Sequence, residues 1–284
     1  MPFTLSHAAA VLPGLRGDGT GRGRLVPAVL VAGSFAPDMT YYAASFLPSA
    51  MAFGDVTHSF PGVFTVDVAV AWALVGAWLL VREPLVALLP RAGQGRLAFL
   101  LRCGAPRARV APPLAAWWYV SAVLGALTHV VWDAFTHLDR WGMRLFPALG
   151  REVAGSPLYW YLQYGGSAVA AVVIVVFVAR ALRRTPRSGT PAVPVLSARD
   201  RWWAAVFLGG CALAGAVRRA ARWWDHWGHL AKPWELIPTV CFGAGAGLVP
   251  ALLVYAAVVR LRRPVPAPAG RAGAGAEPDR RVAR

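Results

Sequence analysis

The chain is poor in charged residues, and above all in acidic ones. Only 15% of its 284 residues are charged and 57% are hydrophobic, and 13 acidic residues stand against 29 basic ones. So small a charged fraction excludes an ordinary soluble globular domain. The three cysteines, Cys103, Cys211 and Cys241, form no disulfide framework, and we interpret them as small apolar packing residues.

Motifs of several well-known enzyme classes are also missing from the sequence. It contains no Gly-x-Ser-x-Gly nucleophile elbow, no glycine-rich strand-turn-helix nucleotide motif and no His-Glu-x-x-His zinc motif. These absences disfavour serine hydrolases, nucleotide-dependent enzymes and zincins. The N-terminus has no positive charge before its apolar stretch, so we expect no cleaved signal peptide and expect the first span to direct insertion.

What the chain has instead is long apolar runs. A helix needs about 17–25 mostly apolar residues to cross the hydrocarbon core of a bilayer. Five stretches meet or approach this length, and the fourth is the shortest. They lie near residues 63–81, 114–135, 164–182, 202–217 and 237–259. The predicted fold is therefore all-α, a polytopic bundle of about five transmembrane helices.

The positive charges are arranged as membrane topology predicts. A net charge of +16 would suggest nucleic acid as the partner of a soluble protein. Here, however, segments 82–109 and 180–201 carry six arginines each, and the tail from 260 carries seven. A five-span chain places all three segments on one side, which the positive-inside rule makes cytoplasmic. We expect a multi-pass plasma-membrane protein with its N-terminus outside, its C-terminus inside, the lipid bilayer as its partner and no nucleic acid bound.

This topology divides the chain into three parts. Residues 1–62 form an outer N-terminal region, in which the apolar stretch 25–35 is too short to span and predicts a buried helix or a re-entrant segment. Residues 63–263 form the bundle, with a flexible Pro-containing linker at 184–199. Residues 264–284 form a disordered cytoplasmic tail rich in Pro, Ala, Gly and Arg. The alternating Gly and Ala at 243–247 indicate close helix packing in lipid.

Inside the second apolar run, His129, Asp133 and His137 follow one another at spacings of four. Residues four apart share one face of a helix, so this stripe offers three metal ligands, and ionisable groups at membrane depth usually have a functional reason. His129 and His137 would be about 12 Å apart along a straight helix, too far to bind one ion. Either the helix unwinds near Thr136, or Asp133 lies between two ions. We favour two ions about 3.5–4 Å apart, with Asp38, Asp133 and Asp67 as sources of carboxylate ligands.

Four segments of the chain carry a family resemblance: residues 1–9, 33–38, 58–62 and 129–137. In order and residue type they resemble an uncharacterised bacterial membrane family, domain of unknown function family 4184. The pattern is also similar to predicted membrane-bound metal-dependent hydrolases and, more distantly, to the zinc-dependent phospholipase C and nuclease fold. The resemblance implies one hydrolase site with metal ligands at His7, Asp38, His58, His129, Asp133 and His137. Within it we assign catalytic roles to Asp133 and His58.

The expected function is a membrane-embedded metal-dependent hydrolase, binding one or two divalent ions, zinc before others. A metal-activated water would attack a phosphoryl or acyl centre, and a site at the outer membrane edge suits a phospholipid or a lipid-linked substrate. The alternative is a non-enzymatic scaffold, assembly factor or small transporter, in which His129 and Asp133 simply hydrogen-bond within the bundle. A weaker second cluster, Asp225, His226 and His229, lies in a Trp-rich segment typical of a membrane interface.

Overall fold

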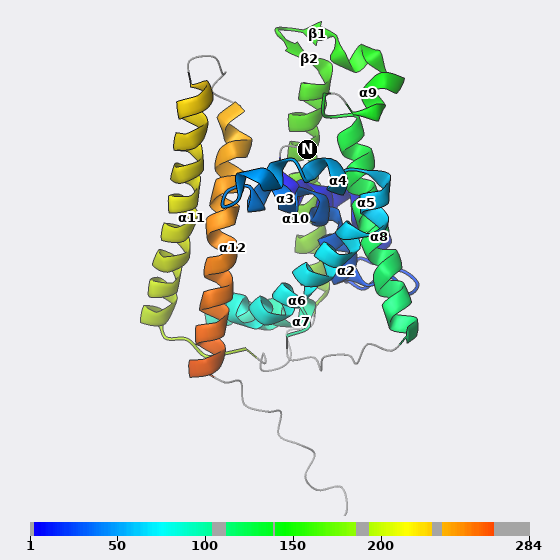
Figure 1. Ribbon diagram of the computed structural model, residues 1–284. Helices are drawn as coiled ribbons and strands as arrows, with labels where there is room; N and C mark the ends of the chain where they lie inside the picture. Colours follow the sequence, from blue (N-terminus) through cyan, green and yellow to red (C-terminus); the bar gives the residue numbers. More distant parts are fainter. Residues whose placement is uncertain (1–2, 104–111, 139, 186–192, 229–234, 264–284) are drawn as a thin grey trace, which may run out of the picture.

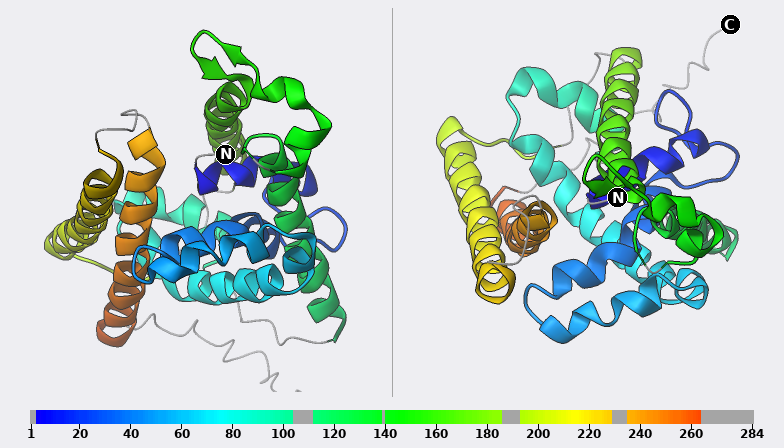
Figure 2. Two further views of the ribbon diagram at one scale, coloured as in Figure 1. Left: turned by 45° about the horizontal axis from the view of Figure 1, so that its top comes forward. Right: turned by 90° about the horizontal axis from the view of Figure 1, so that it is seen from above.

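The computed structural model describes residues 3–103, 112–138, 140–185, 193–228 and 235–263. Five helices are long and apolar enough to cross a membrane, which confirms the predicted all-α bundle. They are α6 (Val66–Ala87), α8 (Pro112–Ala134), α10 (Leu158–Arg184), α11 (Ala198–Trp227) and α12 (Leu236–Arg262). In Figure 1 the axes of α8, α10, α11 and α12 are roughly parallel, with the chain running up α8 and α11 and down α10 and α12, whereas Figure 2 shows α6 crossing them obliquely.

All five helices are longer than the apolar runs that predicted them, and in α6 and α11 the added polar ends are paired. α6 continues past Arg82 and Glu83, whose side chains form a buried ion pair at 2.7 Å. A second arginine, Arg260 of α12, also pairs with Glu83 and ties α12 to α6. α11 begins with a capping box in which Ser197 and Asp200 each accept a hydrogen bond from the other's backbone N–H.

The N-terminal region packs inside the bundle as short helices. Residues 25–35, predicted as a buried helix or a re-entrant segment, form the buried helix α2 (Pro27–Phe35). In Figure 1 these short elements lie between α8 and α12. They are η1 (Thr4–His7), α1 (Ala8–Val11), η2 (Leu12–Gly14), η3 (Ala36–Asp38), α3 (Met39–Ala43), η4 (Pro48–Met51), α4 (Gly54–Thr57) and α5 (Phe60–Phe64).

The remaining elements lie at the two ends of the bundle. α7 (Arg91–Leu100) follows α6 at one end. Beyond the other end of α8 come α9 (Trp141–Leu145), η5 (Pro147–Gly150) and a two-stranded antiparallel hairpin of β1 (Glu152–Val153) and β2 (Ser156–Pro157) (Figure 1). The tail at 264–284 and residues 186–192 of the linker predicted at 184–199 lie outside the described residues.

Glycines set the two closest helix contacts. A Cβ added to Gly125 of α8 would lie 2.3 Å from the Leu30 carbonyl oxygen of α2, and one added to Gly33 of α2 would lie 2.4 Å from the Ala122 oxygen of α8. The predicted packing role of residues 243–247 is realised between α11 and α12, where a Cβ on Gly247 would lie 2.1 Å from the Cys211 oxygen. Small residues let helix backbones approach in this way in lipid.

Candidate metal centre

Helix α8 carries two of the candidate ligands on one face. His129 and Asp133 are both buried, and His129 Nε2 lies 3.4 Å from Asp133 Oδ2. The helix ends at Ala134, so His137 follows the last turn, with its Nδ1 3.5 Å from Asp133 Oδ2. Of the two geometries that the spacing allowed, the structure has the one in which the helix ends before Thr136.

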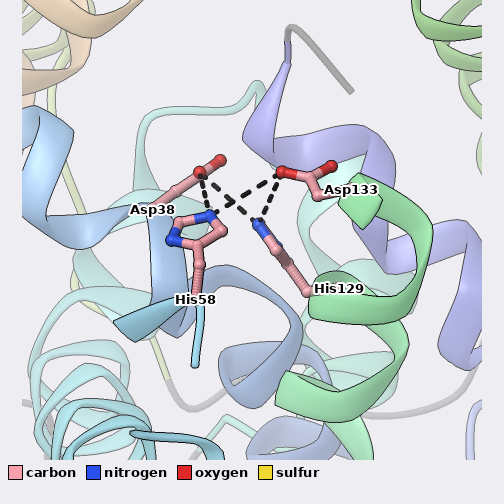
Figure 3. Close-up of side chains that lie close together, drawn as sticks. All are labelled: Asp38, His58, His129 and Asp133. Carbon is pink, nitrogen blue, oxygen red and sulfur yellow. Dashed lines mark ion pairs between the residues drawn. The ribbon is translucent and has the colours of Figure 1, made fainter. Parts of the chain in front are cut away.

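Two short elements of the N-terminal region bring the other two ligands. Asp38 ends η3, and its Oδ1 lies 3.5 Å from His129 Nε2. His58 follows α4, and its Nε2 lies 3.7 Å both from Asp38 Oδ1 and from Asp133 Oδ2. The Thr57 hydroxyl donates to the Pro37 carbonyl at 2.8 Å and so ties the two elements together. We call Asp38, His58, His129 and Asp133 the His/Asp cluster (Figure 3).

Both histidines of the cluster are held in one orientation by backbone carbonyls. His129 Nδ1 lies 2.7 Å from the Ser34 oxygen, and His58 Nδ1 lies 2.9 Å from the Gly54 oxygen. A carbonyl only accepts, so each Nδ1 carries the proton and donates it. In the neutral ring that a metal requires, each Nε2 would present its lone pair toward the two carboxylates. Metal-binding histidines are oriented by the same kind of outer hydrogen bond.

The spacing of the four ligand atoms suits one metal ion. All four lie within 4.8 Å of one another. Two atoms that are each about 2.0–2.1 Å from a tetrahedral ion are about 3.3–3.4 Å apart, and the nitrogen-to-oxygen distances in the cluster are 3.4, 3.5, 3.7 and 3.7 Å. His129 Nε2 is buried and has no hydrogen-bond partner among the described residues. A cation among these atoms would satisfy that nitrogen and neutralise two neighbouring carboxylates.

His7 lies against the cluster without belonging to it. Its ring stacks on that of His129, with centroids 3.6 Å apart and planes 14° apart, and its Nε2 lies 3.4 Å from Asp133 Oδ1. Both ring nitrogens are buried, and neither has a hydrogen-bond partner in the part of the chain that the structure describes. Burial, and then the positive charge of His129, lower the pKa of His7 well below 6.5, so its ring is neutral.

Asp38 is ionised despite its burial. Burial by itself raises the pKa of this carboxyl, but the neighbouring His129 outweighs it and the pKa falls to about 2. The Thr4 hydroxyl donates to Asp38 Oδ2 at 2.5 Å, which leaves Oδ1 directed at the two histidines. Thr4 is therefore a site residue that its position in the sequence did not reveal.

Two further expected residues lie nearby. His137 is joined through its Nε2 to the side-chain amide of Gln163 on α10 at 2.8 Å. The amide donates, so the proton of His137 lies on Nδ1 and faces Asp133. Asp67, near the start of α6, is fully buried, and neither of its carboxylate oxygens has a hydrogen-bond partner in the described part of the chain.

Tyr41 on α3 also lies beside the cluster, and no motif singled it out. Its ring centroid is 5.5 Å from that of His58. Burial, and then the Asp38 carboxylate, raise the pKa of Tyr41 to about 12, so the hydroxyl keeps its proton. A Cβ on Gly54 would lie 2.9 Å from this ring, which shows how closely α3 and α4 are packed around the site.

The weaker second cluster is apart from this centre. Asp225 and His226 are exposed at the end of α11, where the His226 ring packs against Trp227 at 4.7 Å between centroids. His229 lies outside the described residues. No contact between Asp225 or His226 and the His/Asp cluster occurs among the residues that the structure describes.

Fold and site together define a multi-pass helical membrane protein with a buried His/Asp cluster. The family model described as a domain of unknown function, DUF4184, matches residues 1–257. The chain therefore belongs to this family, as the four sequence segments indicated. No curated protein and no solved structure matches the chain.

Proposed function

We propose that the His/Asp cluster binds a divalent metal ion, zinc in the first place, and that the protein is a membrane-embedded metal-dependent hydrolase. The observation that carries the metal proposal is the orientation of His58 and His129, whose Nδ1 protons are donated to backbone carbonyls while both Nε2 atoms face Asp38 and Asp133. Two imidazoles and two carboxylates are a ligand set that zinc accepts.

The hydrolytic proposal depends on groups around the cluster. A bound metal lowers the pKa of water and polarises an ester oxygen. Asp133, assigned a catalytic role from the sequence, lies within 3.7 Å of His7, His58, His129 and His137. Neutral His7, with two unpartnered ring nitrogens, is placed to accept a proton beside Asp133. Tyr41, which keeps its hydroxyl proton, is placed to donate one to a leaving group.

The location favours a substrate that arrives through the bilayer. The site lies within a helical membrane bundle, on the N-terminal region and the end of α8. By the positive-inside rule this end faces outward. We therefore propose a phospholipid or lipid-linked phosphate at the outer face of the plasma membrane as the substrate class.

A second candidate function rests on the fact that four protein ligands surround the proposed ion and leave no open coordination position. The four residues of the His/Asp cluster are all buried, and four protein ligands around one ion are typical of structural sites, whereas catalytic sites keep a position open. In this alternative the metal only clamps η3 and α4 onto α8, and the protein is a non-enzymatic scaffold.

Metal content tests the centre itself. Elemental mass spectrometry of the detergent-purified protein should find about one equivalent of metal, lost in the His129→Ala/Asp133→Ala double variant. The matched control is His226→Ala, since His226 is an exposed histidine remote from the cluster. Absence of metal from the parent after reconstitution with zinc or manganese would refute the centre.

Activity separates the two functions. Metal-loaded protein should hydrolyse a phosphate ester in a screen of phospholipids and lipid-linked phosphates, and a chelator should abolish the activity. Tyr41→Phe should lower kcat and leave the metal content unchanged. Bound metal without turnover of any substrate, together with a large loss of thermal stability on chelation, would support the scaffold.

A further inference from the structure

A group of three arginines on α11 is not explained by the metal centre. Arg218, Arg219 and Arg222, the arginine triad, follow the apolar middle of α11 and converge on Ser45, which follows α3. Arg222 donates to the Ser45 carbonyl at 3.0 Å, and Arg218 donates to the same oxygen. Arg219 donates to the Ser45 hydroxyl at 2.6 Å and to the Tyr41 carbonyl at 2.5 Å.

The triad concentrates positive charge without an acidic partner. Among the described residues, none of the three arginines forms an ion pair with a carboxylate, in contrast to Arg82 and Arg260, which pair with Glu83. Arg218 and Arg222 are four residues apart, and Arg219 and Arg222 three, so like charges face one another on one side of the helix, which is destabilising. An anion bound between the guanidinium groups would remove this cost.

The triad also has N–H donors that remain available to a ligand. A guanidinium carries more N–H donors than the bonds to Tyr41 and Ser45 use. Arg218 and Arg222 are exposed, while Arg219 is half-buried against Phe242, with its guanidinium carbon 5.5 Å from the ring centroid. Planar arginine forks are the donors best matched to phosphate oxygens.

The position of the arginine triad relative to the membrane interface, and the apolar side chains around it, indicate that the phosphate belongs to a lipid. Arg222 lies about 8 Å, and Arg218 about 14 Å, from the Trp227 end of α11 along the helix axis. Trp224 and Trp227, exposed at this end, are typical of the membrane interface. The guanidinium of Arg218 packs over Phe46 at 5.4 Å, and Phe46 and Leu47 are each 62% exposed. Apolar side chains suited to acyl chains thus adjoin donors suited to a headgroup.

One residue connects the triad to the metal centre. Arg219 bonds the Tyr41 carbonyl, while the ring of Tyr41 lies 5.5 Å from that of His58 and 5.6 Å from that of Phe242. Figure 1 shows α3 between α12 and the helices that carry the cluster. A lipid held by the triad would therefore have its headgroup next to the cluster.

We propose that the arginine triad binds the phosphate group of an anionic membrane phospholipid beside the His/Asp cluster. The binding site rests on the triad alone. Only its use in presenting a substrate for hydrolysis depends on the proposed function.

Lipid binding to the full-length protein tests the proposal. Native mass spectrometry in detergent should show phosphatidic acid binding more tightly than phosphatidylcholine. The Arg218→Gln/Arg219→Gln/Arg222→Gln variant should bind phosphatidic acid about tenfold more weakly or worse, because charge-assisted hydrogen bonds are lost. The control is Arg199→Gln, which removes one positive charge from the exposed opposite end of α11. It is matched to the single variant Arg222→Gln and should leave binding unchanged.

Two further variants separate binding from folding and from hydrolysis. Arg222→Gln alone removes one bond to Ser45, so it should keep the parent's thermal stability and metal content and still weaken phosphatidic acid binding. The His129→Ala/Asp133→Ala variant should lose metal and keep lipid binding. Equal phosphatidic acid affinity in the triple variant and the Arg199→Gln control would overturn the site. A triad-dependent affinity for inorganic phosphate but not for phosphatidic acid would overturn its assignment to a lipid.

Discussion

At the scale of single residues, the protonation of the histidines decides what the cluster can do. The Nδ1–H groups of His58 and His129 each donate a hydrogen bond to a backbone carbonyl. This orients the opposite ring nitrogen, Nε2, for binding a metal. His7 has no such partner among the described residues and is kept neutral by burial. A buried imidazole without a hydrogen-bond partner destabilises the fold, and its nitrogens are free to exchange a proton during a reaction.

This state of His7 predicts a pH dependence of stability. The pKa of His7 is lowered in the folded protein, whereas the unfolded chain takes up a proton below about pH 6.5. The free energy of unfolding should therefore fall as the pH drops below 6.5 and be fully retained above it. His7→Gln should reduce this slope by up to about 1.4 kcal/mol per pH unit.

Denaturant titrations of metal-free protein in detergent, from pH 8 down to pH 5, measure this slope. The parent and the variant are compared first at pH 8, where His7 is neutral in both the folded and the unfolded chain. Parallel curves for parent and variant at lower pH would show that His7 is charged in the fold.

The sequence revealed the cluster residues but not the groups that orient them. His129 and Asp133 were identified because they are four apart in an apolar run, Asp38 was identified as a source of a carboxylate ligand, and the resemblance added His58. The bonds to Ser34 and Gly54 are made by backbone carbonyls, which carry no side-chain signature. The arginine triad was not singled out in the sequence, because its convergence on Ser45 spans more than 170 residues of sequence.

At the scale of elements, the contact between α2 and α8 supports the centre. Gly33 and Gly125 let the two backbones approach, and this approach brings the Ser34 carbonyl within 2.7 Å of His129 Nδ1. The geometry of the metal ligand is thus set by residues with no polar side chain. The sequence predicted both helices, but it did not predict that they meet through glycine. A pattern of small residues typical of close helix packing was recognised only at 243–247.

We therefore expect Gly125→Ala to weaken metal binding, although Gly125 is not a ligand. The added Cβ would lie 2.3 Å from the Leu30 oxygen, so α2 must move away, at a cost of about 1–3 kcal/mol. The Ser34 bond to His129 weakens with it, and metal affinity should fall about 10–100-fold, as for other losses of an orienting hydrogen bond.

The control for this variant is Gly76→Ala on α6, where a Cβ would meet nothing within 4 Å. Thermal melting and metal titration of both variants test the idea. Unchanged metal affinity in Gly125→Ala would mean that the helix contact does not position His129.

At the scale of the whole molecule, the helix ends agree with one topology. Figure 1 shows the end of α10, the start of α11 and the end of α12 at the same end of the bundle as α7. These are the arginine-rich segments. The sequence predicted the five long helices from hydropathy alone, but not the oblique path of α6, because direction depends on packing rather than on apolar length.

We expect the η5 end of the bundle to face outward. Starting from a variant without Cys103, Cys211 and Cys241, Ala148→Cys in η5 and Ala92→Cys in α7 place single thiols at opposite ends, both at exposed positions. A membrane-impermeant maleimide applied to intact cells should label the first and spare the second, and permeabilisation should expose both. The reverse pattern would place the His/Asp cluster near the cytoplasmic face.

The order in which the ligands are synthesised follows from their positions. Asp38 and His58 precede the first span, whereas His129 and Asp133 close the second. During biosynthesis the first two ligands leave the ribosome while the other half of the centre does not yet exist. The site can be completed only after α8 has entered the bilayer and α2 has docked on it. If the cluster binds metal as proposed, it can do so with all four ligands only late in membrane insertion.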